Sequence, residues 1–477
     1  MNTLKKNYGF IIIGLLMEII AFLFLGNSEA KLTLIIAIIG IPIGLIVIWY
    51  MSKSYENTLV SCIFSIFLLP LGGYIFLRLG LLDKQWIFYT LFYGLVLLLL
   101  IKNGLFNRIN KEKVLFKNKY IRIALIVLLI INVIFAYNKQ LSFMLVTLSF
   151  LPFITLFYII QSSYFDDRKK FYNKILNAAA LGALLSGFPD LLYYIIGLSR
   201  GNAIRLFGPL GANSIIVYML LMFIIILSKW SKVKGIKNIW TLYIIGYILV
   251  LGIQESRGAL IAIFSTFILY LIFDIKNWKK YISVFFLVGI MMFSNVTSRP
   301  DVTHDINDVI EETQNESIKE EDKSGFKEIL FKVIDSQSKN RQILWKAGIE
   351  ITEDYKLTGV GIGNFKLFYN EYSGSDRPYS DAHNILLNLS SELGLPFMIV
   401  SLILMIKFGI DMLVGYFKNK GNTKLTYLAG GICLVAFFLY GNLTGIALNF
   451  SVEVYSFTST FIILFMLFYS DSISEFS

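Results

Sequence analysis

Charged residues are scarce in this chain of 477 residues. They make up 16% of it, while hydrophobic residues make up 56% and the mean hydropathy is +0.68. The core of a soluble protein cannot absorb so much apolar surface, so the composition indicates an integral membrane protein. Aspartate and glutamate are rare inside the long apolar runs, which argues against a proton or sodium relay through the membrane.

Cysteine and histidine are also few, with 2 residues of each. Cys62 and Cys433 both lie in apolar segments, so we expect small buried side chains rather than a disulfide or a metal site. The sequence contains neither a CxxC nor an HExxH motif. Nothing in its cysteine or histidine pattern therefore points to a bound metal.

Long apolar runs dominate the chain instead. A helix needs about 20 apolar residues to cross the hydrocarbon layer, and the runs are continuous rather than alternating, which favours helices over a barrel. We predict an all-α, polytopic transmembrane protein with about 14 spans. The predicted spans are 9–26, 32–51, 58–79, 85–101, 121–136, 142–161, 175–197, 212–228, 239–254, 257–273, 281–295, 385–406, 425–447 and 454–470.

The N-terminus resembles a signal peptide, because Lys5 and Lys6 precede the apolar run 9–26. The run lacks a clear small-x-small cleavage site and is followed by many more spans. We therefore predict a retained first transmembrane helix.

Lysine and arginine follow the positive-inside pattern when the N-terminus is placed in the cytoplasm. The loops that then face the cytoplasm carry 25 of these residues, whereas the short outside loops carry six. We predict a multi-pass protein of the cell membrane with both termini cytoplasmic. The net charge of +11 follows from this orientation and from contact with anionic headgroups, so no nucleic-acid partner is expected.

This topology divides the chain into three parts: transmembrane helices over 1–295, a large extracytoplasmic loop over 296–384, and three more helices over 385–477. The loop first carries nine acidic residues and one lysine between Asp301 and Asp322, with His304 among them. This pattern is typical of a solvated, mobile segment, although a divalent cation or a basic partner is the alternative. An amphipathic helix ending near Asp354 is predicted to follow.

Polar candidates gather at the end of this loop. Arg341 and Trp345 are four residues apart and so share one helix face, and the fork of donors on arginine suits a phosphate or diphosphate. Gly359, Gly361 and Gly363 lack the spacing of a Rossmann or P-loop motif. They predict a flexible loop around the site, or else a close approach of backbone N–H groups to an anion.

His383 follows in Asp381-Ala-His383-Asn384. Ser380 or Asp381 is a candidate cap for the next helix. His383 would then lie in the first turn, where the helix dipole favours a neutral imidazole able to accept a proton.

Two outside loops add further arginines. Arg257 opens a transmembrane helix directly after a polar turn, where Glu255 is a candidate ion-pair partner, and Arg205 lies in a Gly-rich loop. The alternative for each arginine is a side chain that reaches the headgroup level. Three arginines and one histidine on one face suit a negatively charged substrate that must lose a proton, such as a diphosphate-linked lipid attacked by a hydroxyl.

These residues resemble the O-antigen polymerase/ligase family of bacterial glycan-assembly membrane enzymes. The resemblance covers roughly 200–470 and rests on motifs that recur in order: Arg205-x-x-Gly208 with Asn213, Ser256-Arg257-Gly258, Arg341-x-x-x-Trp345, Gly359-x-Gly361-x-Gly363-x-Phe365, His383-Asn384 and Glu392-x-Gly394. It implies a GT-C-like helical fold with chemistry on the outer face and with no cofactor, nucleotide sugar or metal. The acidic segment 301–322 has no place in this pattern.

The resemblance also implies residue roles. Arg257 and Arg341 hold the diphosphate of an undecaprenyl-diphosphate-linked glycan and help it leave, and His383 positions or deprotonates the acceptor hydroxyl. Substrate contacts are expected from Arg205, Glu255, Trp345, Gly361 and Asn384. Membrane lipids surround the protein, and a chain-length regulator and a flippase are expected as partners by analogy.

Three functions stay open. A repeat-unit polymerase transfers the glycan to another lipid-linked unit and is favoured by the number of spans. A ligase transfers it to a separate acceptor. A lipid-linked oligosaccharide flippase predicts internal repeats and charges at the membrane midplane, whereas the sequence shows no such repeat and its polar candidates lie at one face of the membrane.

Deletion of 301–322 is the test of the mobile-segment prediction. Glycan transfer and membrane insertion should both survive the deletion, because a solvated segment contributes no packing. Loss of transfer in a protein that still inserts normally would instead assign the acidic residues a role in binding.

Overall fold

A computed structural model describes most of the chain between residues 46 and 444. The described residues are 46, 48–78, 85–109, 119–199, 216–233, 238–253, 257–297, 341–374, 379 and 381–444. Within these ranges the protein is helical, with a single isolated bridge between Ile109 and Ser163 and no strand. The predicted helical class is thereby confirmed for this part of the chain. The predicted spans 9–26 and 454–470, most of 32–51, and the acidic segment lie outside it.

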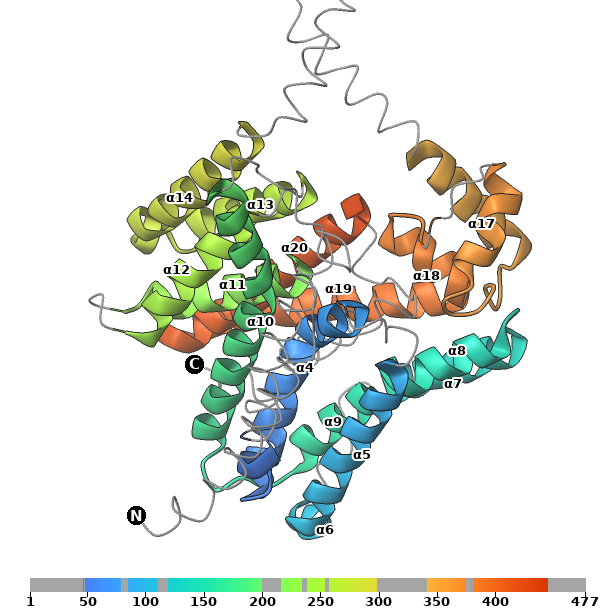
Figure 1. The fold of residues 1–477 in the computed structure, drawn as a ribbon, viewed down its shortest axis with the longest axis horizontal. Helices are drawn as coiled ribbons and strands as arrows, with labels where there is room; N and C mark the ends of the chain where they lie inside the picture. Colours follow the sequence, from blue (N-terminus) through green and yellow to red (C-terminus); the bar gives the residue numbers. More distant parts are fainter. Residues whose placement is uncertain are drawn as a thin grey trace, which may run out of the picture.

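The first half of the described chain forms a series of helical segments, which Figure 1 shows from blue to green. They are α4 (Tyr55–Arg78), α5 (Gln85–Lys102), α6 (Leu105–Arg108), α7 (Lys119–Phe135), α8 (Lys139–Leu145), the π-helix η3 (Val146–Phe150), α9 (Leu151–Ser162) and α10 (Arg168–Ser199).

The second half begins with α11 (Ile216–Trp230), α12 (Ile239–Gly252), α13 (Arg257–Phe273), the short η4 (Ile275–Asn277) and α14 (Trp278–Thr297). A helix over 341–354 precedes α17 (Phe365–Ser373), α18 (Ile385–Leu393), α19 (Leu395–Lys418) and α20 (Gly421–Thr444). The predicted amphipathic helix ending near Asp354 is confirmed.

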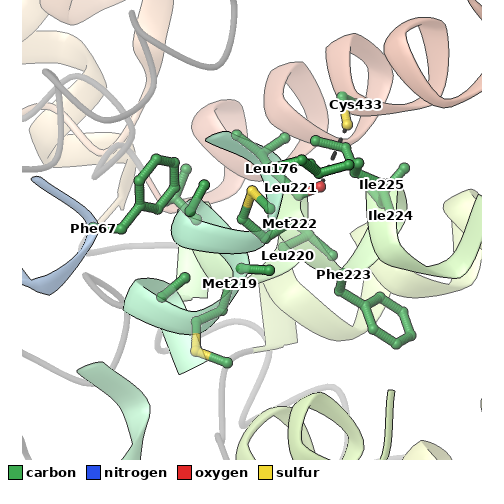
Figure 2. Close-up of a cluster of buried hydrophobic side chains, with 14 of the residues drawn as sticks. Phe67, Leu176, Met219, Leu220, Leu221, Met222, Phe223, Ile224, Ile225 and Cys433 are labelled. Carbon is green, nitrogen blue, oxygen red and sulfur yellow. Dashed lines mark hydrogen bonds between the residues drawn. The ribbon is translucent and has the colours of Figure 1, made fainter. Parts of the chain in front are cut away.

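Helix α11 lies at the centre of the fold because it is apolar on every side. Its residues from Met219 to Leu227 are all buried, and it packs against α10, α12, α13 and α20 (Figure 2). Polar groups inside this core find partners: the Tyr270 hydroxyl donates to the carbonyl of Ile224 at 2.7 Å, and the Cys433 thiol lies 3.6 Å from the carbonyl of Leu221. Cys62 and Cys433 are both buried and free, as predicted.

Helices α4 and α10 pack closely because glycine lies at their contact. A Cβ on Gly182 would lie 2.6 Å from the carbonyl oxygen of Phe64, so the two backbones approach as only small residues allow. The Ser186 hydroxyl donates to the carbonyl of Phe67 at 2.6 Å across the same contact.

The outer surfaces of the bundle are apolar, as expected of a membrane protein. On α19 the exposed positions recur every three or four residues and make one continuous face: Ile399, Ile403, Ile406, Ile410, Leu413 and Phe417. Two described helices, α19 and Gly421–Leu443 of α20, are long and apolar enough to span a membrane, and the pair α13–α14, bent by 111°, makes up to a third. The predicted number of 14 spans is not confirmed.

The predicted span 385–406 is wrong as a single helix. Gly394, with φ 86°, separates α18 from α19. A Cβ at this position would lie 2.5 Å from the carbonyl oxygen of Leu357, and the N–H of Leu395 donates to the carbonyl of Lys356 at 2.8 Å. The break therefore lets the chain segment after helix 341–354 pass against the start of α19.

In Figure 1, α17 and α18 lie on the opposite side of the bundle from α12, α13 and α14.

Gly182→Ala tests the close contact of α4 and α10. Its Cβ would require Phe64 to shift, and overpacking of this kind costs about 1–3 kcal/mol. The matched control is Gly94→Ala in α5, where the new Cβ meets nothing within 4 Å. Both changes gain the same helix propensity. We expect a lower melting temperature in detergent for Gly182→Ala alone, and equal melting temperatures would contradict the packing described here.

Candidate active site

His383 lies in a tight turn that Asp381 holds from within. One carboxylate oxygen of Asp381, Oδ1, accepts the backbone N–H of His383 at 2.7 Å and also lies 2.7 Å from its ring nitrogen Nδ1. His383 has φ 50° and is the one non-glycine residue with positive φ in the described part of the chain. Such a conformation is strained and persists where surrounding contacts enforce it. The contacts of Asp381 therefore hold the turn and fix the imidazole relative to this carboxylate.

Two asparagines fix the turn to α18. The side-chain oxygen of Asn388 accepts the N–H of Ala382 at 2.7 Å. Asn384 caps α18, because its side-chain oxygen accepts the N–H groups of Leu386 and Leu387 at 3.0 and 3.1 Å. The predicted cap, Ser380 or Asp381, is therefore wrong: Asp381 is bound to His383, and His383 precedes the helix instead of lying in its first turn.

Burial, Asp381 and Arg341 act together on the pKa of His383. Burial lowers the pKa of His383, but the charge and hydrogen bond of the Asp381 carboxylate outweigh it, and the pKa is raised above its ordinary value even though the positive charge of Arg341 lowers it. This corrects the predicted shift towards a neutral ring. With Nδ1 directed at Asp381, a neutral His383 carries its proton there and has its lone pair on Nε2.

Helix 341–354 packs directly on this turn. Its buried stripe is formed by Leu344, Ala347 and Ile351. A Cβ on Gly348, in the same stripe, would lie 3.3 Å from the Cβ of Ala382. The Thr352 and Ser390 hydroxyls lie 2.9 Å apart and join the helix to α18.

This packing brings the predicted Arg341 into electrostatic reach of His383. Trp345, one turn along the same helix, is 37% exposed.

The Gly-rich segment 359–365 is a packed connection rather than a flexible loop. Gly359, Gly361 and Gly363 all have positive φ, and a Cβ on Gly361 would lie 2.4 Å from that of Ala136. The N–H of Gly361 donates to the carbonyl of Glu392 at 3.0 Å, so it is used within the protein. The arrangement gives Gly361 a close-packing role in place of the predicted anion contact.

Side chains from α7 and α8 complete this connection. The Asn132 amide nitrogen donates to the carbonyls of Thr358 at 2.6 Å and Glu392 at 2.7 Å, while its oxygen accepts the N–H of Ile362 at 3.2 Å. The Ser142 hydroxyl donates to the carbonyl of Ile362 at 2.9 Å. Every polar atom of the Asn132 amide is thus directed at segment 358–362 or at the end of α18.

Aromatic rings surround the turn. The ring of Tyr379 meets that of His383 edge to face, with centroids 5.9 Å apart, and Tyr369 of α17 packs on Tyr379 in the same way. The Tyr372 hydroxyl donates to Asp354 at 2.6 Å and ties α17 to helix 341–354.

Sequence reasoning did not select Asp381, Asn132 or Tyr379 as site residues. A lone asparagine within the apolar run of α7 was the signal for Asn132.

The structure describes only some of the remaining predicted site residues. Arg257 begins α13, while Arg205 and Glu255 lie outside the described residues. Arg341, Trp345, Gly361, His383 and Asn384 belong to elements that pack together. The candidate site is therefore the region around helix 341–354, segment 359–365 and the turn before α18.

Residues 242–402 match the family model described as O-antigen ligase. The matched segment contains α13, α14, helix 341–354, the Gly-rich segment, the His383 turn and α18. This match confirms the resemblance to the O-antigen polymerase/ligase family. No curated protein matches the chain. The match and the apolar helices together support a membrane protein of the glycan-transfer type.

Asp381→Asn tests the electrostatics of the pair. Burial and Arg341 then act on the imidazole without the opposing carboxylate, so the pKa of His383 should fall by about one to three units. The chain has only two histidines, so ¹³C-histidine NMR of His304→Gln protein gives one titrating signal. A pKa that is unchanged by Asp381→Asn would contradict the assigned contact.

Proposed function

We propose that this protein transfers a glycan from undecaprenyl diphosphate to an acceptor hydroxyl on the outer face of the cytoplasmic membrane, as a polymerase of repeat units. The observation that supports it best is the Asp381–His383 pair within electrostatic reach of Arg341, inside the segment that matches the O-antigen ligase model. A base and a fixed cation are the two groups that this displacement requires.

In the proposed reaction, the oxygen of the acceptor hydroxyl attacks the anomeric carbon of the donor sugar. Nε2 of neutral His383 takes the proton of that hydroxyl as the bond forms. The bond between that carbon and the diphosphate oxygen breaks, and its electron pair leaves with the diphosphate. The imidazolium is stabilised by Asp381, at 2.7 Å from Nδ1. A base with a pKa near the working pH suits this step.

Arg341 stabilises the negative charge that develops on the leaving diphosphate, and Arg257 is proposed to act with it. A guanidinium matches two phosphate oxygens at once and stays charged at every relevant pH. Positive charge that is already in place when the bond breaks lowers the barrier without reorganisation. We further propose substrate contacts for Trp345, Arg205 and Glu255.

Ligase activity is the second candidate, favoured by the description of the matching family model as O-antigen ligase. The proposed chemistry at His383 is the same for both candidates, and only the acceptor differs. A polymerase needs a second lipid-linked repeat unit as acceptor, whereas a ligase needs a separate one.

Transfer by purified protein tests the proposal. With a lipid-diphosphate-linked repeat unit as sole substrate, we expect a ladder of products by size. His383→Asn, which tolerates the positive φ, should reduce the rate by about 10²–10⁴-fold, because a general base is removed. Product only after addition of a separate acceptor would establish a ligase. No product under either condition would overturn the proposed function.

The matched pair for the cation is Arg341→Ala and Lys346→Ala. Both changes remove one positive charge from helix 341–354, but the Lys346 side chain is 77% exposed and pairs with Glu350. We expect loss of transfer only for Arg341→Ala, with both variants inserted normally. Equal losses would show that overall positive charge, and not the position of Arg341, matters.

A further inference from the structure

Glu392 is a buried carboxyl group that the proposed reaction does not use. It lies near the end of α18 and is 2% exposed. One of its oxygens, Oε1, accepts the backbone N–H of Phe365 at 3.1 Å, and the N–H of Gly363 also donates to the carboxyl group. Within the described residues its other oxygen, Oε2, has no hydrogen-bond partner. An ionised carboxylate left in this state would be costly.

A second buried oxygen, on the residue before Phe365, also has no donor among the described residues. It is the side-chain oxygen Oδ1 of Asn364. Two acceptor oxygens with no donor therefore lie at one end of the Gly-rich segment. Buried polar groups are normally paired, so this double absence needs an explanation.

Rotation of the Asn364 amide does not resolve the shortage. The Ser142 hydroxyl has one proton and donates it to the carbonyl of Ile362 at 2.9 Å. It must then accept from Nδ2 of Asn364, which lies 3.0 Å away. Turning the amide over would take the Ser142 proton from Ile362 and leave that buried carbonyl without it. One proton is missing in either arrangement.

We propose that Glu392 is a neutral carboxylic acid whose proton lies on Oε2 and is donated to Oδ1 of Asn364. A single proton then satisfies both oxygens, and no charge is buried. Burial raises the pKa of Glu392 to about 8, the N–H groups of Gly363 and Phe365 oppose this shift, and the negative charge of Asp381 adds to it. The groups that contact this segment from α7 and α8, Asn132 and Ser142, are uncharged.

This acid joins the two halves of the candidate site. Its proton connects α18 to segment 359–365, which continues from helix 341–354 and Arg341. α18 in turn holds the His383 turn through Asn384 and Asn388. Glu392 is therefore a positioning residue, and this part of the inference rests on the proposed function. The protonation itself does not.

Infrared spectroscopy of the full-length protein in detergent tests the protonation. At pH 7 we expect the carbonyl stretch of a protonated carboxyl group. It should be absent in Glu392→Gln and present in the control Glu353→Gln, which removes an exposed carboxylate. If Glu392→Gln fails to fold, ¹³C-glutamate labelling of the wild type should shift the band. The same labelling distinguishes the band of Glu392 from any band of the buried Asp190, which the label does not shift. A band that is shifted by ¹³C-glutamate labelling and survives Glu392→Gln, or no such band at pH 7, overturns the proposal.

Stability against pH gives a second readout. The folded pKa is raised above the ordinary value of 4.5 to about 8. The folded state therefore stays protonated at Glu392 up to a higher pH than the unfolded state does. The free energy of unfolding should fall as pH rises from about 5 to 8. The melting temperature of the wild type should decline over this window relative to Glu392→Gln, which has no such proton. Parallel curves would contradict the raised pKa.

Transfer assays separate positioning from simple folding. Gln keeps a donor for Asn364 and an acceptor for Phe365, so Glu392→Gln should retain transfer within a few fold, while Glu392→Ala should lose at least tenfold. Equal loss in both would contradict the neutral-donor role. A protonated Glu392 in a wild-type protein without transfer would leave the protonation standing and overturn the proposed function alone.

Discussion

The backbone of segment 359–365 is buried against apolar helices, so its polar groups need partners within the protein. The chain meets this constraint with a few side chains and the end of α18. Asn132 bonds both segment 358–362 and the end of α18, and Ser142 bonds Ile362. The carbonyl groups of Ser391 and Glu392 accept the N–H groups of Val360 and Gly361. Because these bonds are directional, they fix segment 359–365 relative to α18. The elements that carry Arg341 and His383 are thereby held together.

The electrostatics of the site follow from this placement. His383 is pulled towards the charged state by Asp381 and away from it by Arg341 and burial, so its pKa depends on the distance between elements that are remote in sequence. Glu392 lies near the other end of α18 and, as the neutral acid we propose, adds no charge that would disturb this balance. The proposed chemistry therefore rests on a few polar groups held by an apolar bundle.

The sequence predicted where the helices lie better than it predicted where they begin, end and break. Hydrophobic runs located α5 and α7 to within a few residues, since burial in an apolar core or in lipid needs only composition and length. The break at Gly394 was missed, although the polar residues Asn388, Ser390, Ser391 and Glu392 just before it distinguish 385–393 from the apolar 395–406. The cap was assigned to Ser380 or Asp381 instead of Asn384, since all three residues are good caps and only the contact with His383 decides. Asn132, more than 200 residues away from its partners, has no local signal for them.

Chemical rescue of His383→Gly tests the central claim, that His383 is the base of a transfer reaction. Glycine suits the positive φ of this position, so the change removes the imidazole without adding backbone strain. Added imidazole should restore transfer of a lipid-linked glycan, and the restored rate should rise with pH as more of the imidazole becomes neutral. A folded His383→Gly protein that transfers as fast as the wild type without imidazole would contradict the account.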